Sequence, residues 1–128
     1  VISFLLIVPE LSFCTTTVYF MLSLLSLNAR ALKNNVKSKA TFLYCKEQKA
    51  KKKILQETHS SSEETKFWKL QWGDQIYFSH GTLHSAGVMI MFHKFPGSLL
   101  EHISDTNGHW VTVIVEIDGN KLILVCIY

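Results

Sequence analysis

The chain has 128 residues, a formal net charge of +3 and 48% hydrophobic residues. This length corresponds to a single domain, which would bury roughly two thirds of the surface of the unfolded chain if it packs as one unit. Its three cysteines, Cys14, Cys45 and Cys126, are odd in number and far apart. This arrangement argues against a disulfide framework or a zinc knot and favours a reducing compartment.

Residues 1–27 contain a single charged side chain, Glu10. The uncharged run 11–27 lies near the short limit of a transmembrane helix, which needs about 20 residues. Three interpretations stay open. The run is a signal anchor helped by the basic stretch that follows, an unrelated upstream segment, or, in its last part, a buried strand.

The spacing of apolar residues becomes helical over residues 36–50. We expect one stripe to form the apolar face of this helix, made of Val36, Ala40, Leu43, Tyr44 and Ala50. The run 54–56 then predicts a short strand that leads into Glu57. If residues 22–28 also form a strand, the order strand, helix, strand predicts a βαβ unit.

The second half of the chain is dominated by predicted strands. Two overlapping capping-box patterns in residues 60–64 first predict a short helix that begins near Ser62 and ends at Gly73. Runs rich in β-branched and aromatic residues then predict strands over residues 75–79, 86–92, 109–117 and 121–128. Asp118 and Gly119 are the turn signal between the last two strands. Both faces of the last strand are apolar, which predicts burial between two layers.

Four segments in this order resemble the endonuclease domain of non-LTR (LINE-type) retrotransposons, a branch of the endonuclease/exonuclease/phosphatase superfamily that includes apurinic endonucleases. The segments are residues 26–30, 55–59, 85–90, and 105–110 with 122–128. The resemblance spans residues 22–128 and implies an α/β fold: the truncated first half of a four-layer α/β sandwich with a mixed sheet and outer helices. We therefore expect an apolar leader or unrelated upstream segment in residues 1–21 and a partial domain in residues 22–128.

The resemblance also assigns roles to individual residues. Glu57 corresponds to a ligand of Mg²⁺, with Mn²⁺ as an alternative, and oxygen ligation by one or two carboxylates is what Mg²⁺ prefers. Asn28 corresponds to an amide of the metal and water site, and Tyr128 to a phenol that donates a hydrogen bond to the scissile phosphate. His59 is expected to line the same groove. Without the resemblance, each of these residues is an ordinary strand-end, turn or core residue.

The implied parent activity is Mg²⁺-dependent nicking of DNA to prime target-site reverse transcription. The family's later motifs, Gly-Asp-x-Asn and Ser-Asp-His, do not occur in these 128 residues. We therefore expect the chain alone to be inactive or nearly so and to bind metal weakly or not at all. Whether it is an enzyme stays open.

DNA is the partner that the resemblance implies, in the nucleus or the cytoplasm, and no specific protein partner is indicated. A non-catalytic element remnant is one alternative, with a membrane location through residues 1–27. A phosphatase-type member of the same superfamily is another.

Two features depart from the family pattern. Ala31 stands where the family has glycine before Leu32, and it is strained if the turn needs a positive φ. Lysines fill residues 51–53, directly before the apolar run of the Glu57 strand. Burying an unpaired ammonium costs several kcal/mol, so either the strand is short and the lysines reach solvent, or the sequence has drifted.

Two further patterns also have ordinary structural interpretations. Lysines cluster over residues 33–53, which suits a polyanion but equally a solvated helix face. His80 and His84, with His93 beyond them, have the spacing of zinc ligands on a helix. Gly81 and the flanking strand patterns argue against a helix there.

Overall fold

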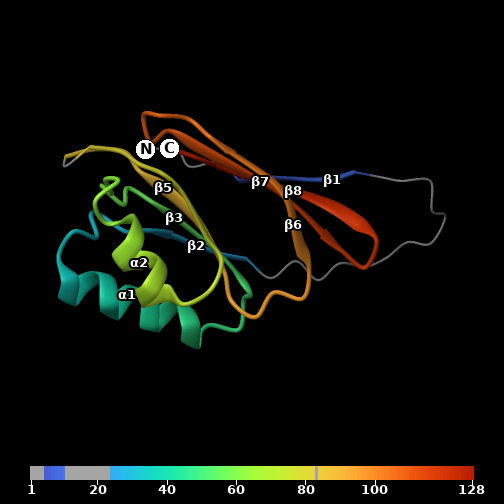
Figure 1. The fold of residues 1–128 in the computed structure, drawn as a ribbon, viewed down its shortest axis with the longest axis horizontal. Helices are drawn as coiled ribbons and strands as arrows, with labels where there is room; N and C mark the ends of the chain where they lie inside the picture. Colours follow the sequence, from blue (N-terminus) through green and yellow to red (C-terminus); the bar gives the residue numbers. More distant parts are fainter. Residues whose placement is uncertain (1–4, 11–23, 83) are drawn as a thin grey trace.

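A computed structural model describes residues 5–10, 24–82 and 84–128 of the chain (Figure 1). Two four-stranded sheets pack face to face, and two helices cover the outer face of one of them. The predicted α/β class with a mixed sheet and outer helices is confirmed.

The mixed sheet has the strand order β2-β3-β5-β4. β2 and β3 run parallel, and the other two pairs are antiparallel. Its strands are β2 (Leu24–Asn28), β3 (Lys52–Gln56), β4 (Ile76–Ser79) and β5 (Val88–Phe92). The second sheet is antiparallel, in the order β1-β8-β7-β6. Its strands are β1 (Leu5–Glu10), β6 (Ser98–Ser104), β7 (Trp110–Ile117) and β8 (Asn120–Ile127).

Two hydrophobic cores hold the layers together. One lies between the two sheets, where alternate residues of β7 and β8 meet β5 and Ile54 of β3. The other lies between the mixed sheet and the helices α1 (Asn35–Glu47) and α2 (Thr65–Trp72). Because β3 separates the two cores, its successive side chains enter opposite layers.

The helix between β2 and β3 forms as predicted, but the predicted apolar face is wrong. The predicted stripe lies on the solvent side, with Val36 79%, Leu43 52% and Tyr44 47% exposed. The buried residues of α1 are instead Ser38, Phe42 and Cys45. The reason is a long-range contact, since the Phe42 ring packs edge-on against two tryptophans of α2, Trp68 at 6.0 Å and Trp72 at 5.9 Å between ring centroids.

The lysines before Ile54 belong to β3, and the alternative of a short strand with lysines in solvent is wrong. Lys52 is 7% exposed and Lys53 is fully buried. The Lys52 ammonium lies over the ring of Phe95, 5.7 Å from its centroid. The Lys53 Nζ has no hydrogen-bond partner among the described residues.

The edges of the antiparallel sheet were not predicted as strands. β6 is mostly exposed, with Leu100 and Ile103 each 47% exposed, and its residues show no alternation of apolar and polar side chains. β1 lies inside the segment predicted as a leader and pairs with β8. The outward face of β8 is half-buried at Val125 and 36% exposed at Ile127, so in the described part of the chain only its inward face is fully covered.

None of the helices in the described residues is long and apolar enough to cross a membrane. Residues 11–23, which make up most of the run predicted as a possible anchor, lie outside the described residues.

Candidate functional site

The carboxyl ends of β2 and β3 share one edge of the mixed sheet because the two strands are parallel. Asn28 lies opposite Gln56, and Glu57 is the next residue along the chain. The backbone continues this pairing beyond the strands, since Ala29 N donates to Gln56 O at 2.8 Å and Ala31 N donates to Glu57 O at 2.7 Å. Asn28 and Glu57 therefore leave the sheet side by side.

The loop after Glu57 is fixed to the start of β5. Thr58 N donates to Gly87 O, and His59 N donates to Ala86 O, both at 3.0 Å. Gly87 has a φ of +89°, and a Cβ atom at this position would lie 2.4 Å from the Thr58 hydroxyl. A side chain at position 87 is therefore incompatible with this approach of the two loops.

The same hydrogen bonding extends to the antiparallel sheet. Gly87 N donates to Gly108 O at 2.9 Å, and Tyr128 N donates to His109 O at 2.6 Å. The four segments that carry the family resemblance thus form one series of backbone contacts at one end of the molecule, toward the left of Figure 1. We call this end the strand-end rim and define it as residues 28–32, 56–60, 85–87, 105–110 and 128.

The carboxylate of Glu57 is half-buried and has no hydrogen bond or ion pair with any described residue. Asn28 is exposed, and its Oδ1 accepts a hydrogen bond from Arg30 N at 3.1 Å, which leaves its amide nitrogen as a donor. Glu57 itself has a positive φ of 53°. A strained backbone that holds an unpaired carboxylate is typical of functional positions.

Tyr128 is half-buried and packs against the core between the sheets. Its ring stacks on His109, with 6.3 Å between ring centroids and an interplanar angle of 16°. The phenol oxygen makes no hydrogen bond to the described residues. Tyr128 is therefore positioned at the rim with a free donor.

The last predicted site residue, His59, lies on the loop beyond Glu57. It is half-buried and has a positive φ of 51°. Its backbone is held by Ala86, while its imidazole has no hydrogen bond or ion pair with the described residues. The structure thus brings all four predicted residues to the strand-end rim.

Gln56 links the two sheets at this rim and was not singled out from the sequence. Its side chain is 4% exposed, and its Nε2 donates to Ser26 Oγ at 3.3 Å and to Cys126 Sγ at 3.9 Å. Burial raises the pKa of the Cys126 thiol to about 12, and the hydrogen bond from Gln56 only partly opposes this effect. The thiol is therefore neutral near pH 7 and serves as a structural contact.

Asp105 fixes the loop that carries His109. Its carboxylate accepts hydrogen bonds from Ser79 Oγ, from His109 N at 2.9 Å and from Trp110 N at 3.3 Å. Burial raises the pKa of Asp105, but these hydrogen bonds outweigh burial, so the net pKa lies below its ordinary value. A carboxylate with this many internal donors has a structural role.

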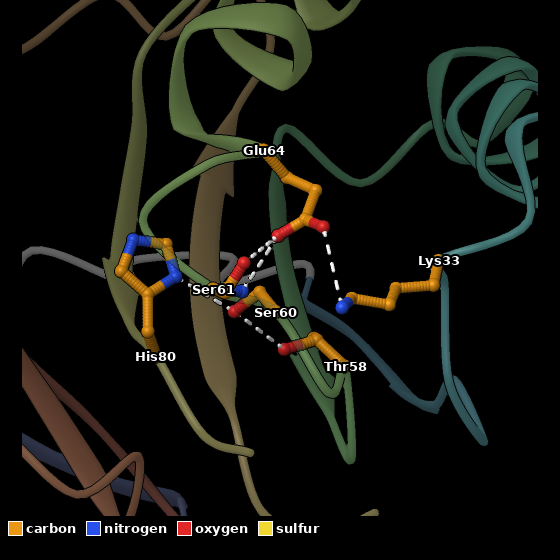
Figure 2. Close-up of polar contacts among 6 residues, drawn as sticks. All are labelled: Lys33, Thr58, Ser60, Ser61, Glu64 and His80. Carbon is orange, nitrogen blue, oxygen red and sulfur yellow. Dashed lines mark hydrogen bonds and ion pairs between the residues drawn. The ribbon is translucent and has the colours of Figure 1, made fainter. Parts of the chain in front are cut away.

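A network of polar side chains links the loop that follows Glu57 to His80 (Figure 2). Thr58 Oγ1 donates to Ser60 Oγ at 3.2 Å, and Ser60 Oγ lies 2.8 Å from His80 Nδ1. The other ring nitrogen of His80 lies 2.8 Å from the hydroxyl of Thr65 at the start of α2. Burial lowers the pKa of His80, and the nearby Glu64 carboxylate opposes this shift.

Glu64, also drawn in Figure 2, links the same loop to the segment before α1. Its carboxylate accepts a hydrogen bond from Ser61 N at 2.7 Å and lies 3.8 Å from the ammonium of Lys33. The Ser61 and Glu64 contact realises one of the capping-box patterns, although α2 begins only at Thr65. The loop after Glu57 is thus held by His80 through Ser60 and by Glu64 through Ser61.

The side-chain oxygens of Asn28 and Glu57 are of the kind that binds a hard cation. Carboxylate and amide oxygens are the ligands that Mg²⁺ and Mn²⁺ prefer, and Mg²⁺ commonly binds through one or two carboxylates, several waters and substrate phosphate. No three His, Cys, Asp or Glu side chains of residues 5–10, 24–82 and 84–128 gather as ligands for one ion. A metal here would therefore depend on Glu57 and on bound phosphate. For the zinc alternative, both ring nitrogens of His80 are already engaged by hydroxyls.

The fold and rim define an α/β sandwich with polar strand ends, and comparison with known proteins adds a relationship. No family model matches the chain. The chain is 27% identical over 108 residues to a Xenopus laevis protein named "Transposon TX1 uncharacterized 149 kDa protein". The match covers 84% of this chain and 8% of that protein. The chain therefore has a distant similarity to a transposon protein and corresponds to a small part of its length.

Proposed function

We propose that this chain is part of a metal-dependent DNA endonuclease of a retrotransposon, with residues 22–128 as a partial endonuclease domain. The observation that supports this proposal is the continuous strand-end rim, which carries Asn28, Glu57 and Tyr128 on adjoining segments. The similarity to a transposon protein supports the retrotransposon origin. The reaction class is hydrolysis of a phosphodiester bond.

Each rim residue has a distinct part in this proposal. Glu57 would hold Mg²⁺ or Mn²⁺, which when bound supplies charge stabilisation at the phosphate. The amide nitrogen of Asn28 would donate to a phosphate oxygen without adding negative charge. The neutral phenol of Tyr128 would donate a second hydrogen bond to the phosphate, where charge develops. The Thr58, Ser60 and His80 network would keep the Glu57 loop in place.

We assign no general base at this rim, because the Gly-Asp-x-Asn and Ser-Asp-His motifs do not occur in the sequence. Binding of metal and phosphate and turnover are therefore separate expectations. The chain alone is expected to bind Mn²⁺ weakly and to nick supercoiled plasmid at or near the background rate.

The test measures Mn²⁺ binding by the relaxation of water protons and compares two charge-matched variants. Glu57→Gln is expected to abolish the binding, whereas Glu63→Gln, which removes an exposed carboxylate near the rim, is expected to leave it unchanged. Equal binding by the wild type and Glu57→Gln would contradict the proposal. Plasmid nicking with Mg²⁺ that disappears in Glu57→Gln would overturn the expectation of inactivity, and turnover of a phosphomonoester instead of plasmid would favour a phosphatase.

A further inference from the structure

Charge is strongly segregated along this chain. Residues 30–53 contain nine of the 13 Lys and Arg residues and one of the 10 Asp and Glu residues, so their formal charge is +8. The remaining residues therefore carry −5, which gives the total of +3. Residues 30–53 comprise the turn after β2, the helix α1 and the start of β3. The positive charge of the protein thus lies mainly on one helix and its two ends.

The cations of this region fall into two groups. Some are engaged by the protein: Lys33 lies 3.8 Å from Glu64, Lys37 Nζ donates to Arg30 O at 2.6 Å, and Lys46 Nζ donates to Gln71 O at 3.4 Å. Lys52 and Lys53 are buried.

The second group is exposed and makes no hydrogen bond or ion pair with the described residues. It consists of Lys39, on the outer side of α1, and Lys49 and Lys51, on the loop that follows this helix. The ninth cation, Arg30, is also exposed but lies at the strand-end rim, before the helix. With no internal partner, these three ammonium groups keep their full charge available to a ligand.

The outer face of α1 begins near the strand-end rim, since the helix follows β2 directly, and it ends at the opposite end of the sheet (Figure 1). A helix of this length spans about 20 Å, which corresponds to about six phosphates along one strand of duplex DNA. Val36 and Tyr44 are exposed on the same helix. Together with Ala40 and Leu43 they form one stripe along the exposed side of the helix, with Lys37 and Lys39 at its two edges. Beyond the helix, Lys49 and Lys51 are the exposed residues of the loop 48–51, so this end of the surface offers charge without exposed apolar side chains, which favours a polyanion over a lipid bilayer.

We propose that the outer face of α1, with Lys39, Lys49 and Lys51, is a docking surface for the phosphate backbone of a nucleic acid. The surface contacts phosphates without reading sequence, because an ammonium group is a point charge that meets the phosphates of any sequence. The choice of nucleic acid as the partner rests on the proposed function, and the surface would extend substrate contact from the rim along the helix.

The test measures binding of a labelled random-sequence DNA duplex by fluorescence anisotropy over a series of KCl concentrations, with EDTA present so that no metal contributes. The triple variant Lys39→Gln, Lys49→Gln, Lys51→Gln is compared with a charge-matched control, Lys66→Gln, Lys69→Gln, Lys94→Gln, whose lysines are also exposed. Each lost phosphate contact is expected to lower the slope of log K against log salt by about 0.9. The triple variant should therefore lose between about 2 and 3 from the slope, while the control retains it.

An equal loss in both triple variants, or no loss in either, would overturn the proposal. Binding of phosphatidylcholine and phosphatidylserine vesicles that needs the three lysines, without binding of the duplex, would also overturn it. Thermal unfolding of each variant checks that the fold is intact, and single substitutions, each lowering the slope by about 0.9, replace a triple variant that does not fold. A wild type that binds the duplex through the three lysines but binds no Mn²⁺, or whose Mn²⁺ binding is unchanged in Glu57→Gln, would reject the nuclease proposal alone.

Discussion

The two ends of the β2 and β3 pair differ in whether their buried polar side chains are hydrogen-bonded. At the carboxyl end, the buried side chains of Gln56 and Thr58 both have hydrogen-bond partners. At the amino end, Lys53 is fully buried and its ammonium has no hydrogen-bond partner among the described residues. Unsatisfied buried charge is costly, and satisfied polar networks fix a conformation. The rim is therefore the organised end of the sheet, and the amino end carries the destabilising feature.

The surroundings of Lys53 explain why no partner is available. The Lys53 ammonium lies 5.9 Å from the centroid of the Trp72 ring, and Cys45 lies in the same core. Desolvation lowers the pKa of Lys53, and the nearby Cys45 and Asp74 oppose this shift. Burial also raises the pKa of the Cys45 thiol to about 11, so this thiol is not an anion that could neutralise Lys53 near pH 7.

The largest predicted effect is a gain in stability from Lys53→Met, which keeps a long side chain against Trp72 and removes the charge. We expect the free energy of unfolding to rise by about 2–3 kcal/mol, because an uncompensated buried ammonium costs several kcal/mol. Urea unfolding measures the change. The control Lys51→Met alters an exposed neighbour and should change stability by less than about 0.5 kcal/mol. No gain in Lys53→Met would show that the ammonium is compensated.

A smaller gain is expected at the rim from Ala31→Gly. Ala31 has a φ of +71°, a left-handed conformation that costs a residue with a Cβ atom about 1 kcal/mol more than glycine. The turn therefore needs the positive φ that the family's glycine suggested. Urea unfolding of Ala31→Gly should show a gain of about 1 kcal/mol, reduced by the extra conformational entropy that glycine loses when the chain folds.

The matched control for Ala31→Gly is Ala40→Gly, at an exposed position inside α1. There the same substitution should lower stability by about 1 kcal/mol, because glycine is a poor helix former. Opposite signs at the two positions support backbone strain at Ala31. Losses at both positions would contradict it.

The smallest predicted effect is a pH dependence that arises at His80. Its folded-state pKa lies below the ordinary value of 6.5 because of burial. The unfolded chain therefore binds more protons below pH 6.5, so the stabilising contribution is full above that pH and is lost as pH falls through the folded-state pKa. His80→Gln should remove this part of the stability difference between neutral and mildly acidic pH, so that the variant loses less stability on acidification than the wild type.

A second histidine, His93, follows β5 near the amino end of β3, and its pKa is also lowered, first by burial. A residual pH dependence is therefore expected in His80→Gln, and His93→Gln should remove a separate part. Unfolding curves collected across this pH range measure both contributions. An unchanged pH dependence in His80→Gln would indicate that the rim network does not favour the neutral imidazole.

Local patterns predicted the elements well and their packing less well. The helix over residues 36–50, the Asp118 and Gly119 turn and most strands follow from periodicity and turn residues. The buried face of α1 does not, because it is decided by the contact of Phe42 with Trp68, whose position depends on the whole fold. β6 was missed for a related reason, since an exposed edge strand needs no alternating pattern.

The residues of the strand-end rim also differ in how far the sequence predicts them. Motifs in the sequence pointed to Asn28, Glu57, His59 and Tyr128, and the structure brings these residues to one edge, while their roles stay predictions. Gln56 was not predicted, and the sequence indicated His80 only as part of a zinc pattern, because the structural role of a buried amide or imidazole is recognisable only through partners on other segments. Such partners are set by strand register, which a single sequence does not specify.

The most direct measurement is an NMR titration of the ¹⁵N-labelled chain with substoichiometric Mn²⁺, which broadens the amide signals closest to the bound ion. We expect selective broadening at Asn28, Glu57 and neighbouring rim residues, weaker broadening of the amides of Lys52 and Lys53 at the other end of β3, and loss of this pattern in Glu57→Gln. Broadening centred on the acidic residues Glu101 and Glu116, or spread evenly over the chain, would contradict a metal site at the strand-end rim.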